Sequence, residues 1–224
     1  MSSRSTEDLV QDLAHRLTPV QPVVRLRVAG ASVLLAWCFA VVASWLLGGG
    51  VPTLASDWPR GDLAFWSILL GLAIAAIGAL LAALGSAVPG REGATRAGRV
   101  TALAGFAWLF GAGLLGFVDS RIETPAAMLA GSSPCLLSGL ALGLPSVLIA
   151  CLFLSRGVAP NLRIAVALAA SGSAALGAFA VHAICPVTSG YHVMLGHCLA
   201  PIVGAALLAV PLAALMARWS PPAR

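Results

Sequence analysis

Several side chains that can bind a metal ion or change their redox state lie close together near the C-terminal end of the sequence. They occur in the stretch HAICPVTSGYHVMLGHC, within a chain otherwise dominated by alanine, leucine, glycine and valine. They are His182, Cys185, His192, His197 and Cys198. Cysteine thiolates can form a disulfide or capture a soft metal ion, and imidazoles can complete the ligand set of such an ion.

The rest of the chain indicates a membrane protein. Of its 224 residues 59% are hydrophobic and only 9% are charged, whereas a soluble domain carries about 25% charged residues. With a mean hydropathy of +0.96 there is too little polar surface to cover a globule, so lipid is the expected solvent. No cleavable signal peptide is visible, and the first apolar segment is therefore expected to remain as a helix.

Six segments are long and apolar enough to cross a bilayer as helices. They are expected at about residues 28–47, 63–88, 100–118, 135–154, 162–184 and 193–217. Helices are expected because exposed backbone polar groups cannot be satisfied in hydrocarbon. The expected fold is thus all-α, with a cytoplasmic partner-docking segment (1–27), a bundle of six transmembrane helices (28–217) and a cytoplasmic tail (218–224).

The arginines indicate how these segments are oriented. The chain contains no lysine, and if its N-terminus is cytoplasmic, eleven arginines lie on the cytoplasmic side. Only Arg60 and Arg121 then lie outside. Because cytoplasmic loops carry the excess of positive charge, both termini are expected in the cytoplasm.

This topology brings two distant cysteines to one side of the membrane. Cys135 begins the fourth expected segment at its outer end, and Cys185 ends the fifth segment on the same side. The connection SRGVAPN is short, so the two helices must form an antiparallel hairpin, and Gly139 and Gly143 predict that its helices pack closely. Four further candidates lie at the same outer ends: His182, His192, His197 and Cys198.

Two reactions compete for Cys135 and Cys185. A disulfide requires their Cα atoms within about 4.4–6.8 Å, and the outer compartment would favour it. The alternative is capture of a soft metal ion by both thiolates with help from imidazoles. His182 and Cys185 can share one helix face, whereas the adjacent His197 and Cys198 point in different directions. The spacing matches no standard zinc motif, and both reactions remain open.

Several functional classes are disfavoured by the sequence. No Asp, Glu, Lys or Arg lies in the middle of a segment, which argues against a proton-coupled transporter or an ion pump. No C-x-x-C, G-x-S-x-G, H-E-x-x-H or P-loop motif occurs, so an enzyme is not expected. No basic run is interleaved with aromatic residues, which argues against direct binding of nucleic acid. A channel or transporter for a small neutral or metal solute, and a structural subunit of a membrane complex, remain as alternatives.

The N-terminal segment carries an apolar stripe with no partner of its own. In DLVQDLAHRLTPVQP, apolar residues recur at helical spacing until the Thr-Pro dipeptide ends the helix. The stripe consists of Leu9, Val10, Leu13 and Leu17. Because the segment is too small to bury this stripe alone, it must bury it on the bilayer surface or in a groove of a cytoplasmic partner.

Together these features resemble the NrsF family of bacterial anti-sigma factors, the negative regulators of sigma F. The resemblance rests on DLVQDLAHRLTPVQP, on Cys135 with the following LLSGLALGLPSVLIACLFLSRGVAP, and on Cys185-Pro186 after a glycine-bearing fifth segment. It covers the whole architecture, although its specific residues lie mostly in the second half. The chain departs from many relatives at Ile184, where they carry histidine.

The resemblance implies a regulator of the bacterial inner membrane that is not an enzyme. It would sequester an extracytoplasmic-function sigma factor and release it under heavy-metal or oxidative stress. Cys135 and Cys185 would be the sensor thiols. No cofactor is expected, apart from a soft metal ion that would bind transiently if the thiols capture one. His182 would replace the imidazole missing at position 184, or no imidazole assists. From spacing and topology alone we add three auxiliary ligands: His192, His197 and Cys198.

Overall fold

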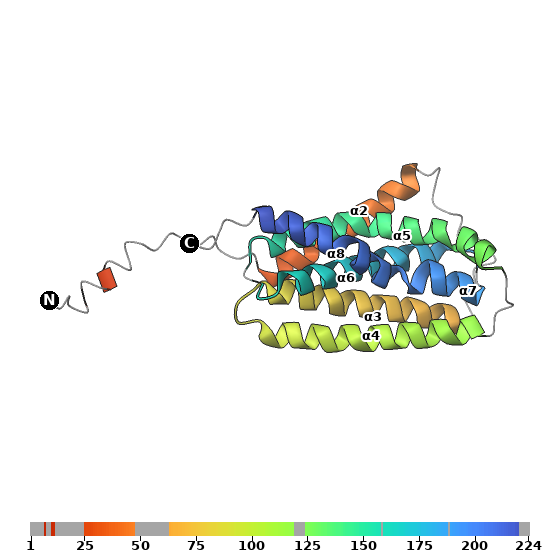
Figure 1. Ribbon diagram of the computed structural model, residues 1–224, viewed down its shortest axis with the longest axis horizontal. Helices are drawn as coiled ribbons and strands as arrows, with labels where there is room; N and C mark the ends of the chain where they lie inside the picture. The colour runs from red at the N-terminus through yellow and green to blue at the C-terminus, as the bar shows by residue number, and fades with distance from the viewer. Residues whose placement is uncertain are drawn as a thin grey trace.

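The computed structural model describes residues 7, 10–11, 25–47, 63–118, 124–157, 159–187 and 189–219. All regular structure within these residues is helical (Figure 1). Six helices among them are long and apolar enough to cross a membrane, which confirms the predicted all-α fold. In the N-terminal stripe only Val10 is described, as helical and 59% exposed. Leu9, Leu13 and Leu17 lie outside the described residues.

Six long helices and two shorter elements are described from Leu26 onward. The long ones are α2 (Leu26–Leu47), α3 (Leu63–Ser86), α4 (Glu92–Val118), α5 (Pro125–Leu154), α6 (Leu162–Ile184) and α8 (Ala200–Trp219). A short helix α7 (Gly190–Val193) and a π-turn η1 (Met194–Cys198) lead directly into α8. These three elements together form the sixth apolar span, Gly190–Arg218.

Helix α5 begins ten residues before the expected start at Cys135. The Thr124 hydroxyl caps the helix by accepting a hydrogen bond from the Ala127 N–H at 3.4 Å, and Pro125 occupies the first turn. Both are common helix-start signals, because the cap satisfies a free N–H and proline has none to satisfy. Cys135 therefore lies inside α5, roughly 15 Å along its axis.

Helices α3 and α6 form the centre of the bundle. In the most apolar stretch of each helix, 72% of α3 and 78% of α6 is buried, compared with 17–33% for the other spans. Large apolar side chains instead point outward, with Leu35 70%, Phe39 75% and Leu115 76% exposed. An exterior of this kind is expected for a protein whose solvent is lipid.

Small residues let the helices approach closely. A Cβ atom at Gly78 would collide with the backbone of Ala102, so α3 and α4 pack almost backbone to backbone. The hairpin of α5 and α6 is packed in the same way, because a Cβ at Gly143 would collide with the backbone of Ser173. A Cβ atom added at Gly139 would lie 3.3 Å from the Cα atom of Ala178. The close packing predicted from Gly139 and Gly143 is therefore found.

The bundle has two chemically different ends. The turn between α3 and α4 and the turn between α5 and α6 lie at one end, where Gly157 packs against Ala87. The two turns and the adjoining helices line a groove that includes Arg96 and Arg99. Helix α7 lies at the opposite end (Figure 1). The side of the membrane that each end faces stays a prediction.

Candidate functional site

The two cysteines expected to meet do so. The Sγ atoms of Cys135 in α5 and Cys185 after α6 are 3.8 Å apart. Both are free cysteines, since a disulfide would bring the sulfurs to about 2.05 Å. Cys185 is 8% exposed and Cys135 is half-buried. The antiparallel hairpin thus places two thiols at one level of the bundle although they are fifty positions apart.

Cys185 owes its position to the proline that follows it. Proline disfavours helical backbone in the preceding residue, and Cys185 is extended, with φ −74° and ψ 123°. Helix α6 therefore stops at Ile184. The N–H of Cys185 donates a hydrogen bond to the carbonyl of His182 at 3.4 Å. The Cys-Pro pair consequently fixes the thiol at the end of the central helix.

Cys135 is placed by the close approach of α5 to the π-turn. Gly196 in η1 faces α5, and a Cβ atom there would lie 3.3 Å from the Ser132 carbonyl oxygen and 3.4 Å from the Cys135 Cβ. Any side chain at position 196 would therefore press on α5 at the thiol. The missing side chain of Gly196 allows Cys135 to reach the rest of the cluster.

The π-turn also brings two histidines to one side of their helix. In a regular α-helix, residues five apart are separated by roughly 140° around the axis. In η1 the N–H of Leu199 instead bonds to the carbonyl of Met194, five residues back, at 3.1 Å. The extra residue in this turn rotates His197 back toward His192, and their ring centroids are 5.4 Å apart.

The sequence contains one signal for this π-turn that our sequence analysis missed. Pro201 lies four residues after His197. Because proline has no N–H, it cannot donate the hydrogen bond that the His197 carbonyl would accept in an α-helix. The regular ladder resumes only with the bond from Val203 N–H to the Leu199 carbonyl at 3.0 Å. Proline inside a span is thus the local reason for a wider turn at this point.

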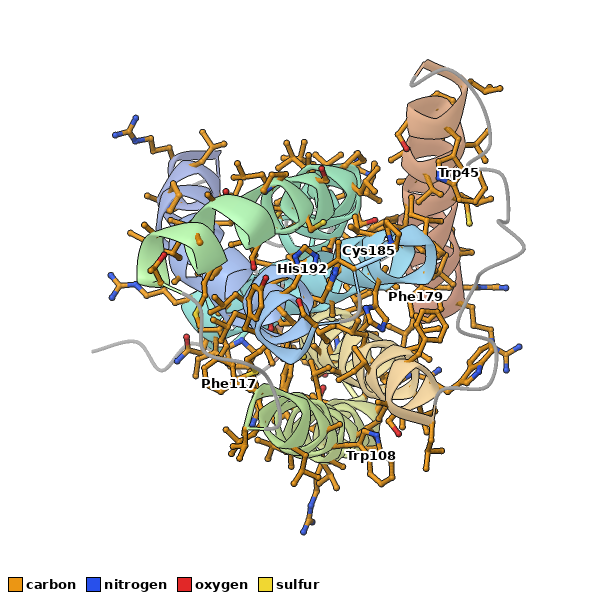
Figure 2. All side chains as sticks on the ribbon, turned by 90° about the vertical axis from the view of Figure 1, so that its right-hand side faces the viewer. Trp45, Trp108, Phe117, Phe179, Cys185 and His192 are labelled. Atoms are coloured by element: carbon orange, nitrogen blue, oxygen red, sulfur yellow. The ribbon has the colours of Figure 1, made fainter. Side chains whose placement is uncertain are left out.

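Cys135, Cys185, His192 and His197 form one cluster. The Nε2 atom of His192 is 3.3 Å from the Cys185 Sγ, and one potential ligand atom from each of Cys135, Cys185, His192 and His197 lies within 4.8 Å of all the others. His192 is 2% and His197 0% exposed. Viewed from the α7 end, Cys185 and His192 lie side by side near the middle of the bundle (Figure 2).

The cluster can react in two ways. Its two thiols are near enough to be oxidised to a disulfide after a small movement. Its four N and S atoms are also a ligand set that could hold a metal ion. Neither ring nitrogen of His197 has a hydrogen-bond partner among the described residues, which is rare for a fully buried polar side chain.

The two other candidate ligands lie beside the cluster and outside the four-residue group. The ring of His182 stacks on Phe65, with centroids 4.9 Å apart, and it also packs edge-on against the ring of His197. Cys198 is fully buried and faces α4, where its Sγ lies against Gly113. Although Cys198 is adjacent to His197, its side chain therefore points to a different helix.

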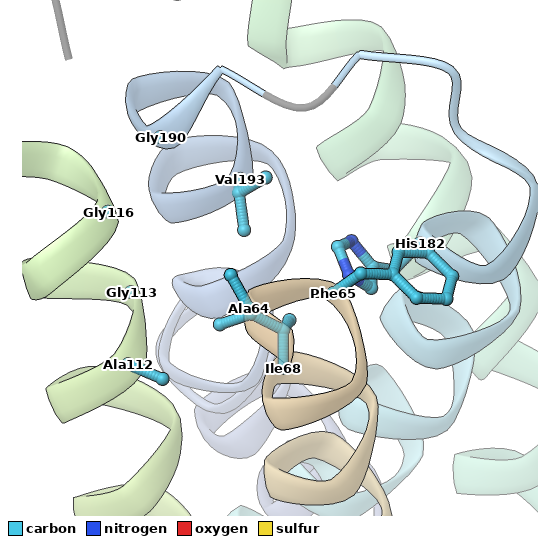
Figure 3. Close-up of a pocket in the computed structure, with 9 residues that line it drawn as sticks. All are labelled: Ala64, Phe65, Ile68, Ala112, Gly113, Gly116, His182, Gly190 and Val193. Carbon is cyan, nitrogen blue, oxygen red and sulfur yellow. The ribbon is translucent and has the colours of Figure 1, made fainter. Parts of the chain in front are cut away.

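A small cavity adjoins this end of the bundle. It lies between α3, α4, α6 and α7 and has a volume of about 50 Å³. Phe65, Ile68 and Val193 form part of its wall, and His182 is the only polar side chain among the described residues that line it (Figure 3). With one polar side chain among its described lining residues, the cavity is poorly suited to hold ordered water.

Comparison with known proteins places the cluster in a regulatory family. Residues 13–219 match the family model described as NrsF, negative regulator of sigma F. The match includes all six spans and the four residues of the cluster. No curated protein and no solved structure matches the chain.

Proposed function

We propose, since the chain belongs to the NrsF family of negative regulators of sigma F, that it holds an extracytoplasmic-function sigma factor at the inner membrane and releases it when Cys135 and Cys185 react. Family membership makes the chain an anti-sigma factor whose partner is a sigma factor, which suggests a regulatory and non-enzymatic role. The class of the sigma factor, the cytoplasmic location of both termini and the sensing of heavy metal or oxidant are parts of our proposal.

The distance of 3.8 Å between the two sulfurs is the observation that carries the sensor proposal. Hydrogen peroxide can oxidise the two thiols to one disulfide: the S–S bond forms, the O–O bond breaks, and the two thiol protons leave in two waters. Bond formation would draw the sulfurs together by about 1.8 Å, since a disulfide is about 2.05 Å long. Helix shifts of about 1–2 Å are enough to switch packed interfaces.

The α5–α6 hairpin connects the thiols to the opposite end of the bundle. Its two helices pack through Gly143, where neither backbone can shift independently of the other. The turn between them packs against the α3–α4 turn at Gly157 and Ala87. A change in the positions of Cys135 and Cys185 would therefore alter the arginine-bearing end, which is the cytoplasmic end in our proposal.

The N-terminal stripe of Leu9, Val10, Leu13 and Leu17 is the proposed docking element for the sigma factor. Val10 is exposed in the structure, and the segment precedes α2 at the end that we assign to the cytoplasm. A short amphipathic helix of this size suits a groove on another protein. Release requires that the sigma factor bind the two states of the membrane domain with different affinity.

The sensor is tested by replacing both thiols. In membranes treated with peroxide or cadmium, the chain with Cys135→Ser and Cys185→Ser is expected to keep its sigma factor in a pull-down measured by mass spectrometry. The matched control is Cys151→Ser, a buried cysteine of α5 outside the cluster, which is expected to release the partner as the parent chain does. Release from the double variant under both treatments would rule out these thiols as the sensor.

A further inference from the structure

We infer that Cys135, Cys185, His192 and His197 form a closed four-ligand site for a tetrahedral, thiophilic divalent cation such as Zn²⁺ or Cd²⁺. The inference deepens the proposed function by naming the ligand class and the complete ligand set. Only the step from binding to sigma-factor release rests on the proposed function, because binding itself can be measured in the absence of any partner.

The distances between the ligand atoms agree with a tetrahedron. With metal–sulfur bonds of about 2.3 Å and metal–nitrogen bonds of about 2.0–2.1 Å, tetrahedral angles place two sulfurs about 3.8 Å apart and a sulfur and a nitrogen about 3.5 Å apart. The structure has 3.8 Å between Cys135 Sγ and Cys185 Sγ and 3.3 Å between Cys185 Sγ and His192 Nε2. With all four ligand atoms within 4.8 Å of one another, only small side-chain movements would close the site.

The chemistry of the ligands selects the cation. Two thiolates would neutralise the double charge of the ion, which matters because an uncompensated charge in a buried place is costly. Sulfur and imidazole suit zinc-type ions, whereas calcium and magnesium prefer oxygen. Among the described residues the cluster contains no carboxylate. A metal bond would also give His197 the partner that it lacks within the described part of the chain.

The π-turn determines which side chains belong to the site. It turns His192 and His197 to the same side, and it leaves the neighbouring Cys198 facing α4. His182 contacts the ring of His197 but stacks on Phe65. The chain thus offers two matched controls, one imidazole and one thiol next to the site but outside it.

Four protein ligands would leave no coordination position open. A closed site of this kind holds structure together and does not activate water. The bound ion would join α5, the end of α6 and the π-turn. It would also occupy both thiolates, so that the metal-bound state and the disulfide state exclude each other.

Binding is tested with Co²⁺ as a spectroscopic probe. The full-length reduced protein in detergent is titrated with Co²⁺, whose visible absorption reports tetrahedral coordination and thiolate ligation, and Zn²⁺ or Cd²⁺ then competes for the site. One equivalent of tetrahedral Co²⁺ is expected. Loss of a hydrogen-bond partner of a ligand already costs about 10–100-fold in metal affinity, so loss of a ligand itself in His192→Ala or His197→Ala should weaken binding at least about tenfold. Although His182 packs against the ring of His197, neither ring has a hydrogen-bond partner among the described residues. His182→Ala and Cys198→Ala should therefore bind as the parent chain does.

A second readout covers variants that fold poorly. Binding is compared only between variants whose circular dichroism spectrum and elution volume match those of the parent chain. In the parent chain, protection of the cysteines from alkylation is measured as well. Zn²⁺ is expected to protect Cys135 and Cys185. An octahedral Co²⁺ spectrum, unprotected thiols, or equal weakening by His182→Ala and His197→Ala would overturn the site.

The same variants separate this inference from the proposed function. If the parent chain binds the ion but keeps its sigma factor, the site is supported and metal-triggered release is wrong. If the parent chain binds no ion but peroxide still releases the sigma factor, the four-ligand site is wrong and the thiol sensor stands.

Discussion

Gly196 offers a test in which no ligand is removed. A Cβ atom at this position would lie 3.3 Å from the Ser132 carbonyl oxygen, 3.4 Å from the Cys135 Cβ and 3.7 Å from the His192 Nε2. With alanine, α5 must therefore yield by a few tenths of an ångström. Metal–ligand distances stay within about 0.2 Å of their usual values, so the Cys135 side chain would have to recover this displacement of α5 in order to stay bound.

The expected effects differ between two substitutions of Gly196. Gly196→Ala should weaken Co²⁺ affinity about tenfold, which corresponds to about 1.4 kcal/mol. It should not destabilise the helix, because alanine is favoured over glycine by about 0.8–1.0 kcal/mol in helices. Gly196→Leu adds three more carbon atoms against α5 and should abolish tetrahedral binding. The Co²⁺ affinities of both variants are measured in the same detergent titration.

A matched control for Gly196 lies on the facing helix. Gly131 is one turn before Cys135, and a Cβ atom there would have nothing within 4 Å. Gly131→Ala should therefore bind Co²⁺ as the parent chain does. Parental affinity in a correctly folded Gly196→Leu chain would refute the argument that the π-turn sets the distance to Cys135.

Three further predictions follow from the packing and from the proposed docking. Pro201→Ala supplies an N–H for the His197 carbonyl, so the π-turn should relax toward an α-helix and Co²⁺ affinity should fall. Pro211→Ala in the same helix should leave Co²⁺ affinity unchanged. Equal affinities of the two variants would contradict the role of Pro201. Gly143→Val should lower stability by about 1–3 kcal/mol through overpacking of the hairpin, measured by thermal unfolding in detergent, and an unchanged melting temperature would disprove the close contact. Leu13→Asp should abolish co-purification of the sigma factor while membrane insertion stays normal, and undiminished co-purification would end the docking proposal.

Much of the fold was predictable because the expected solvent is hydrocarbon. Backbone groups in lipid must bond within their own helix, so hydropathy alone identified six spans. The ends of the helices were less predictable, because capping residues decide them and the length of the apolar segment does not. The Thr124-Pro125 signal extends α5 well before Cys135, and a cap of this kind adds nothing to a hydropathy profile.

The candidate site was predictable in part. A short connection forces α5 and α6 to be antiparallel, and counting residues along both helices places Cys135 and Cys185 at one level. The choice among the imidazoles was not predictable from spacing. In a regular helix His192 and His197 would face different directions, and a backbone change near Pro201 brings them together.

The helical class, the number of spans and the meeting of the two thiols depend on hydropathy, connection length and the rise per residue, and all three can be obtained from the amino-acid sequence. Which imidazoles join the thiols was seen only in the fold, where His192 and His197 do so and His182 and Cys198 stay outside. The physical reason is rotation: the direction of a side chain around its helix axis changes by about 100° for each residue inserted into a turn. Here that direction is set by the π-turn before Pro201, and the missing side chain at Gly196 lets α5 come near.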